Sequence, residues 1–312
     1  MSTPTESLPD PAGPAGPAGF AEPGPAGSGL PAPGLAADRP RHLALRPGTW
    51  LTWAVLAFFL LNLAGVIASV LLNSFGSRWF DSWLPGGWTS HWYTDAWKEF
   101  SLGQVLGVTL EVTLLVVAIS LALGVPAAYA LARRDFPGKK ALNLLFILPI
   151  LVPPIAYGIP LATMLYKVHL AGTLTGVILA NLVPSIPFVV FTMTPFIEQI
   201  DPRIEAAARV CGARTPTVLG RILGPLLLPG MLAAGILVLV RTFGMFELTF
   251  LTSGPSSQTL VVTLFSAVNS AGIRSTQSID AMAVVYTGSM AVLLLIALRF
   301  VNPTQLVARS AD

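Results

Sequence analysis

Six long apolar segments alternate with short polar ones along this chain of 312 residues. They lie at about 51–73, 102–132, 141–166, 174–197, 226–250 and 279–300. A helix that crosses a membrane needs about 20 mostly apolar residues, and each segment reaches that length. Buried helices of a large soluble core would be shorter and fewer. The pattern therefore predicts an all-α integral membrane protein with six transmembrane helices.

The composition supports this prediction. Hydrophobic residues make up 54% of the chain and charged residues 11%, with a mean hydropathy of +0.72. Soluble globular domains contain about 25% charged residues, so this chain lies far from their balance.

Lysine and arginine are distributed unevenly among the polar segments. Thirteen of the 18 precede the first apolar segment, lie in the second and fourth connections, or follow the last segment. The opposite side carries four, at Arg78, Lys98, Lys167 and Arg274. Because cytoplasmic loops collect Lys and Arg, we expect both termini and the connection after Ile204 to face the cytoplasm.

Prolines interrupt the third and fourth apolar segments. The third contains Pro149, Pro153, Pro154 and Pro160, and the fourth contains Pro184, Pro187 and Pro195. Each removes a backbone hydrogen bond and kinks or unwinds a helix. Unwound backbone is tolerated in a membrane only where protein or water covers it, so the third segment is expected to face a bundle interior or a pathway.

The ends of the chain carry less information. Residues 1–48 form a Pro/Ala/Gly-rich stretch, which predicts a disordered cytoplasmic tail, and 303–312 a short cytoplasmic C-terminal tail. Residues 49–100 hold the first transmembrane helix and an external loop rich in aromatic residues, namely Trp79, Trp83, Trp88, Trp92, Tyr93 and Trp97. Such residues favour the membrane–water interface. The loop is either a helix lying on the outer membrane face or a docking surface for an outer binding protein.

The sequence shows no chemistry of its own. Cys211 is the one cysteine, and His42, His91 and His169 are scattered over different loops without a metal-ligand spacing. No GxxxxGK[ST], GxSxG or HExxH pattern occurs. We therefore expect a non-catalytic chain without cofactor or metal, and any ATP hydrolysis would come from another subunit.

The polar connection between the fourth and fifth segments predicts two short helices. Asp201 is a suitable N-cap and Pro202 a suitable first residue for a helix that Gly212 ends by adopting positive φ. Thr215 and Pro216 are expected to start the second helix. The small side chains at 206–208 would allow a partner surface to approach closely.

The spacing in this connection resembles the EAA loop of permease subunits in binding-protein-dependent ABC importers. The matching positions are Ala207, Ala208, Gly212, Ile222 and Pro225. Ala206 stands where the family has Glu and Gly224 where it has Leu, and Glu205 is expected to supply the acidic group. The stretch 124–140 is also similar to the family. The resemblance implies that a separate ATPase contacts Glu205, Ala206, Ala207, Ala208, Arg209, Gly212, Ala213, Ile222 and Pro225.

The same resemblance implies a fold and partners. Residues 101–302 would form a type I ABC importer transmembrane domain with cytoplasmic coupling helices, in the bacterial plasma membrane. It would work by alternating access with a homologous or identical permease subunit, two ATPases and an extracytoplasmic solute-binding protein. The stretches 167–190 and 246–265 look like those of carbohydrate-type permeases, and polyamine-type permeases have related versions. An ATP-independent secondary transporter is the rival class, and it would show an internal repeat, which is not seen here.

Polar residues inside the apolar segments are the candidates for lining a pathway. Arg241 falls near the middle of the predicted fifth span, where a charge costs about 2.5–3.5 kcal/mol on insertion scales. The other candidates are Glu111, Asn181 and Glu247. These groups either line a pathway or form buried stabilising pairs. Six residues separate Arg241 from Glu247, so we expect Arg241 to find its partner on another helix or across the subunit interface, and not at Glu247.

Overall fold

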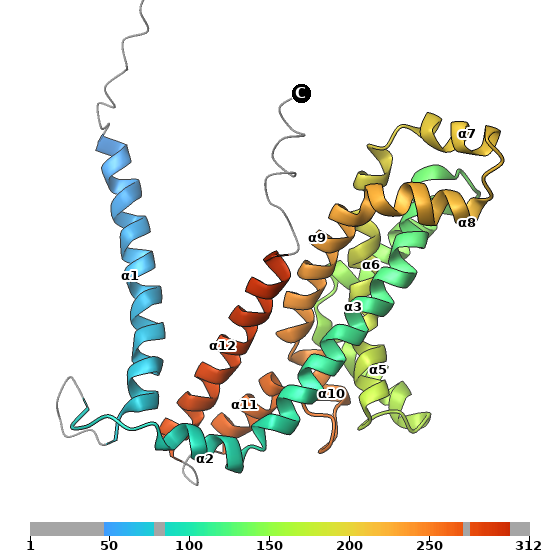
Figure 1. Ribbon diagram of the computed structural model, residues 1–312. Coiled ribbons are helices and arrows are strands. Elements are labelled where there is room, and N and C mark those ends of the chain that lie inside the picture. The colour runs from blue at the N-terminus through green and yellow to red at the C-terminus, as the bar shows by residue number, and fades with distance from the viewer. Residues whose placement is uncertain (1–46, 78–84, 271–274, 300–312) are drawn as a thin grey trace, which may run out of the picture. The chain divides into compact units, whose positions relative to one another are not determined.

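The computed structural model describes residues 47–77, 85–270 and 275–299, and these are almost entirely helical (Figure 1). The predictions about the tails at 1–46 and 303–312, and about Trp79 and Trp83, fall outside the described residues. The helices are α1 (Pro47–Phe75), α2 (His91–Glu99), α3 (Leu102–Arg133), α4 (Lys139–Leu151), α5 (Pro154–Lys167), α6 (Leu174–Glu198), α7 (Pro202–Val210), α8 (Thr215–Thr217), the π-helix η1 (Val218–Leu223), α9 (Gly224–Phe243), α10 (Glu247–Thr252), α11 (Leu260–Asn269) and α12 (Thr276–Arg299).

The chain divides into two compact units at Leu56. The described part of the first unit is the start of α1, which runs from Pro47 to Leu56. The second unit begins at Ala57 and contains the rest of α1 and all the other helices. The core, the site and the pocket described below belong to the second unit.

Five helical runs in the described residues are long and apolar enough to cross a membrane. They are Trp50–Phe75, Leu102–Arg133, Leu174–Glu198, Val218–Phe243 and Thr276–Arg299. A sixth crossing results if α4 and α5 count as one broken span. The predicted membrane class is thereby confirmed, and the predicted ends of the second and fourth spans agree with α3 and α6 to within one residue.

The third predicted span is bent by 102° between α4 and α5. The bend lies at Val152 and Pro153, whose ψ values of 131° and 135° are extended and not helical. A residue before proline avoids the α region, and Pro153 and Pro154 follow Val152 directly. The prolines therefore break this segment, as the sequence predicts.

The predicted bounds of the fifth span, 226–250, are wrong. The helix starts eight residues earlier with η1 and ends at Phe243, and α10 is a separate short helix. Pro225 does not interrupt this helical run. It lies in the first turn of α9, and the π-helix η1 directly precedes that turn. In that π-helix the Gly224 N–H reaches back five residues to the Leu219 carbonyl. Accordingly, α8 leads straight into this run and is not the separate second helix that the sequence predicted.

The main core lies where α3, α6 and α9 pack together. Val116 on α3, Val189 on α6 and Val238 on α9 are fully buried within it. Gly124 permits the close approach of α3 to α6, because a Cβ at this position would lie 2.6 Å from Cγ1 of Val189. Small residues at such interfaces let membrane helices pack backbone to backbone.

The aromatic region after α1 contains the helix α2. The ring of Tyr93 packs against that of Phe75 at a tilt of 40°, with ring centroids 4.9 Å apart, and its hydroxyl lies 2.9 Å from Oγ of Ser74. The indole N–H of Trp92 donates to the Gly76 carbonyl at 2.8 Å. These contacts hold α2 against the end of α1. This arrangement is consistent with the predicted surface helix. The alternative, that this region docks a binding protein, stays a prediction.

Candidate functional site

The helix α7 forms as local sequence chemistry predicts. Oδ1 of Asp201 accepts a hydrogen bond of 2.8 Å from the Arg203 N–H, and Pro202 occupies the first turn. The helix ends before Gly212, whose φ of 84° lies in the left-handed region. The Gly212 N–H donates to the Arg209 carbonyl at 2.9 Å. Gly212 is suited to this position because a side chain there would be strained.

The Glu205 side chain points inward from α7 towards α3. The residue is only 6% exposed. The hydroxyl of Tyr129 donates to Oε2 at 2.6 Å, and Nε of Arg133 donates to Oε1 at 2.9 Å. Arg133 also donates from its second guanidinium nitrogen to the Ile200 carbonyl, which lies just before α7. Two residues of α3 thus fix the start of α7, and a buried carboxylate needs partners of this kind.

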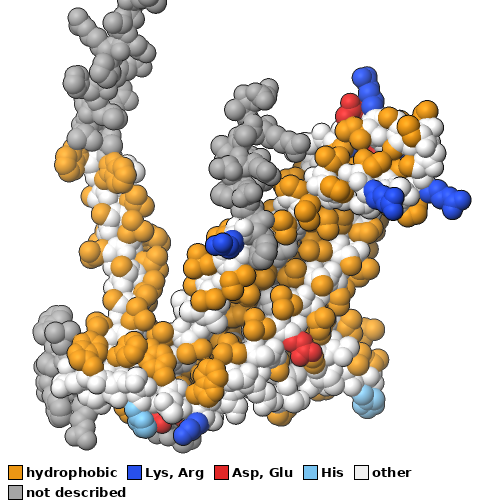
Figure 2. Space-filling view, in the orientation of Figure 1, with side chains coloured by type: hydrophobic (Ala, Val, Ile, Leu, Met, Phe, Trp, Pro, Cys, Tyr) orange, Lys and Arg blue, Asp and Glu red, His pale blue; other side chains and the backbone are white. Residues whose placement is uncertain are grey.

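The opposite face of α7 is open and mostly apolar. Val210 is 89% exposed and Ile204 is 43% exposed, and Ala207 and Cys211 are exposed as well. Ala206 is also exposed but lines the same pocket as Glu205. Figure 2 shows Lys and Arg side chains gathered over the end of the molecule that carries α7 and α8. An apolar patch with a basic rim is a surface suited to another protein.

The remaining predicted contact residues lie on this loop in different settings. Arg209 and Pro225 are exposed, whereas Ala208, Ala213 and Ile222 are half-buried. Ala208 and Ala213 pack against the main core. The loop therefore has an inner side, anchored by Glu205, and an outer side centred on Ala207.

Tyr129 and Arg133 lie in the stretch 124–140, which resembles the family, but the sequence pattern does not pair them with Glu205. The spacing of Tyr129 and Arg133 is the sequence feature that indicates a shared partner. Residues four apart lie on one face of a helix, so both side chains at the end of α3 can reach a single carboxylate.

The pathway candidates occupy different environments. Glu111 is exposed on α3. Asn181 is 1% exposed, and its Nδ2 donates to the Val177 carbonyl at 2.9 Å and to Oγ1 of Thr249 on α10 at 3.2 Å. Its Oδ1 is buried without a hydrogen-bond partner in the described structure. Asn181 thus links α6 to α10.

Arg241 lies in the last turn of α9, not in the middle of a span as predicted. Its Cζ is 5.6 Å from the ring centroid of Phe188 on α6, so it does meet a group on another helix. Glu247 begins α10, directly after the break at 244–246. The buried hydroxyl of Tyr157 on α5 has no hydrogen-bond partner in the described structure.

Within the described ranges, no three His, Cys, Asp or Glu side chains come together in a group that could hold a metal ion. The two carboxylates among the predicted site residues of α7 and α10, Glu205 and Glu247, belong to different helices.

Comparisons with known proteins identify the family. Residues 120–306 match the family described as "Binding-protein-dependent transport system inner membrane component". The trehalose transport system permease protein SugB of Mycobacterium tuberculosis (strain CDC 1551 / Oshkosh) is 31% identical over 190 residues, covering 60% of this chain and 69% of that protein. The molybdenum transport system permease protein ModB of Escherichia coli (strain K12) is 29% identical over 188 residues, covering 55% of this chain and 82% of that protein.

A solved structure shows the same fold. A chain of a bacterial ABC transporter involved in the import of the acidic polysaccharide alginate aligns with a TM-score of 0.65 at 16% identity, covering 80% of this chain and 93% of that one. The chain therefore belongs to the inner-membrane components of binding-protein-dependent transport systems and is a multi-pass permease subunit of an ABC importer.

Proposed function

We propose that this chain pairs with a second permease subunit to form the pathway of an ATP-driven importer for a carbohydrate. Two ATPases bind on the cytoplasmic side at α7, and an extracytoplasmic binding protein delivers the solute. Both termini are cytoplasmic, in accord with the distribution of Lys and Arg. Closure of the ATPase dimer on ATP moves α7, and the pathway opens outward.

The observation that carries this proposal is the two-sided character of α7. Its outer side exposes Ala207 and Val210 to a partner, and its inner side is tied through Glu205 to Tyr129 and Arg133. A push on the outer side is therefore transmitted to α3. Because α3 packs along α6 and α9, the push reaches the core of the bundle.

The polar groups at the ends of α9 and α10 are proposed to line the pathway. Arg241 and Glu247 flank the break at 244–246, where backbone is not helical. Asn181 holds α10 in place through Thr249. Glu111 is exposed on α3 and is proposed to face the cavity between the two permease subunits.

The choice of a carbohydrate rests on two supports. The stretches 167–190 and 246–265 resemble those of carbohydrate-type permeases, and the similar SugB is described as a trehalose transport permease. Polyamine import is the alternative. ModB, described as a molybdenum transport permease, is about equally similar, so family membership alone does not select the solute.

Reconstitution tests this function directly. The chain would be purified with the ATPase and binding protein encoded in neighbouring reading frames and placed in proteoliposomes. We expect uptake of a labelled neutral sugar that requires ATP and the binding protein. Uptake driven by an ion gradient without ATP would identify a secondary transporter instead. ATP-dependent uptake of spermidine, with no uptake of neutral sugars, would replace the carbohydrate by a polyamine.

A further inference from the structure

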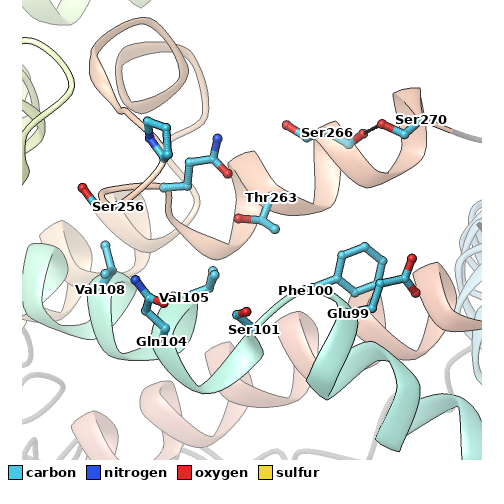
Figure 3. Close-up of a pocket in the computed structure, with 12 residues that line it drawn as sticks. Glu99, Phe100, Ser101, Gln104, Val105, Val108, Ser256, Thr263, Ser266 and Ser270 are labelled. Carbon is cyan, nitrogen blue, oxygen red and sulfur yellow. Dashed lines mark hydrogen bonds between the residues drawn. The ribbon is translucent and has the colours of Figure 1, made fainter.

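A polar pocket of about 290 Å³ lies at the end of α3 remote from α7. Figure 3 shows Gln104 and Val108 of α3 on one wall, facing Thr263 and Ser266 of α11 on the other. Phe100, which is 5% exposed, adds an apolar surface at the corner between α2 and α3. Concave sites that combine apolar surface with a few polar groups are the usual form of ligand pockets.

The loop between α10 and α11 supplies the third side of this pocket and is held on two sides. The Leu260 N–H donates to the buried Oγ1 of Thr109 on α3 at 2.9 Å. Oγ of Ser257 donates to the Gly172 carbonyl at 3.0 Å and accepts from the Gly254 N–H at 2.8 Å. Loop residues at the pocket, among them Ser256 and Gln258, are thereby preorganised.

The hydroxyl groups of α11 that line the pocket donate their protons to backbone carbonyl groups. Thr263 donates to the Thr259 carbonyl at 3.1 Å, Ser266 to that of Val262 at 3.0 Å, and Ser270 to that of Ser266 at 2.8 Å. Their oxygens therefore offer only lone pairs to a ligand. A ligand at this wall has to bring hydrogen-bond donors.

The other polar groups of the pocket further restrict the class of ligand that it can bind. Glu99 adds a carboxylate, and Gln104 and Gln258 add amides that both donate and accept. No Lys, Arg or His lies among the described residues that line the pocket. An oxyanion only accepts hydrogen bonds and would find no donor among the three hydroxyl groups of α11. A polyamine only donates and would leave the amide N–H groups unmatched. A hydroxyl group both donates and accepts hydrogen bonds, so it can pair with the α11 hydroxyl oxygens, with the carboxylate and with the amides.

We propose that this pocket binds a neutral, multiply hydroxylated solute of the size of one sugar ring, before that solute enters the membrane pathway. The position on the solute's route rests on the proposed function, since α7 marks the cytoplasmic end and this pocket lies at the other end of α3. With 32 residues rising about 1.5 Å each, α3 separates the two ends by about 48 Å.

Protection of a single cysteine tests the proposal on the full chain in lipid nanodiscs. Ser266→Cys would be made in a Cys211→Ser background and treated with a small thiol reagent. The probes are trehalose, maltose, sucrose and glucose at tens of millimolar, with molybdate and spermidine as the charged comparisons. We expect at least one neutral sugar to slow labelling several-fold, and neither charged probe to do so. Ser90→Cys, at the far end of α2 and outside the pocket, should label at the same rate throughout.

Two variants define the chemistry. Gln104→Leu, which removes an amide of similar size, should weaken protection about tenfold, as the loss of one good hydrogen bond does. Glu99→Gln keeps the shape and one acceptor oxygen and removes the charge, so a neutral sugar should still slow labelling, whereas a cation would lose its counter-charge. Loss of protection in Glu99→Gln together with protection by spermidine would show a cation site and overturn the proposal.

Absence of protection by all four sugars would also overturn it. The outcome is distinct from failure of the proposed function, because binding to the single chain needs no ATPase. ATP-driven sugar uptake without protection would reject the proposed sugar site and retain the proposed importer function. Protection without ATP-driven uptake would retain the sugar site and reject the importer function.

Discussion

The carboxylate of Glu205 and the hydroxyl of Tyr129 form a hydrogen bond of 2.6 Å between α7 and α3, although 76 residues separate them in the sequence. Arg133 completes the arrangement at 2.9 Å. The acidic residue of this loop is therefore turned towards the membrane subunit's own helix and away from the open face.

Replacing Glu205 by Ala should destabilise the protein and impair uptake. The change leaves Arg133 largely buried without its counter-charge, and breaking such a pair costs about 3–5 kcal/mol. A thermal melt in detergent measures the loss, and transport assays measure uptake per folded molecule. Arg214→Ala, at an exposed position outside the pocket that Glu205 lines, is the matched control and should leave the melting temperature nearly unchanged. Equal melting temperatures for the two variants would contradict the anchoring role.

Ala207→Glu should leave the protein inserted and folded but abolish ATP-driven uptake. Ala207 is exposed, so the longer charged side chain costs the single chain little and obstructs a partner that approaches closely. Co-purification with the ATPase subunit measures docking. If the variant transports at the wild-type rate, the proposed contact on this face is wrong.

Gly212→Val should damage coupling for a different reason. Gly212 has φ 84°, and a β-branched residue in that region costs about 1–3 kcal/mol, enough to shift the end of α7. Gly220→Ala is the matched control, since an added Cβ there meets nothing within 4 Å. We expect loss of uptake for the first variant alone. A similar loss for both would point to general fragility of the loop.

A cysteine at Ser256 should react with a membrane-impermeant reagent added outside intact cells, whereas native Cys211 should react only after the membrane is opened. Both positions are exposed, so accessibility within the fold does not distinguish them. The reverse labelling pattern would overturn the proposed orientation.

Arg241→Met retains length and removes the charge that lies over Phe188. If Arg241 lines the pathway, uptake per folded molecule should fall or change specificity while the ATPase still binds. A purely structural role would instead lower the melting temperature and leave uptake per folded molecule normal. That second result would remove Arg241 from the pathway.

The fold was predictable where the apolar pattern and helix-end chemistry agree. The limits of α3 and α6 follow from the lengths of their apolar runs, and the start of α7 follows from Asp201 and Pro202. The fifth span was misplaced because Pro225 looks like a helix start when it stands alone in sequence. A preceding π-helix, which depends on tertiary packing, makes that proline compatible with a continuous helix.

The inner side of the site could not be predicted from local patterns. Nothing near Glu205 in the sequence shows that it turns inward, because its partners Tyr129 and Arg133 belong to a helix more than 70 residues earlier. The setting of Arg241 was missed for a related reason. Its distance from the helix end depends on where α9 stops, and α9 stops before Gly244, seven residues short of the predicted limit at 250.

The π-helix also ties the length of the loop to the angular phase of α9. The buried residues Val218, Leu223 and Leu227 are spaced by five and then four positions, so the wide turn absorbs one extra residue. Deleting one residue there would restore regular winding and turn the side chains before the deletion by about 100° relative to those after it. Either α7 and Glu205 would swing away from α3, or Leu227 and Val238 would leave the core. The number of residues between Gly212 and Pro225, and not only their identity, thus sets how α7 is aimed.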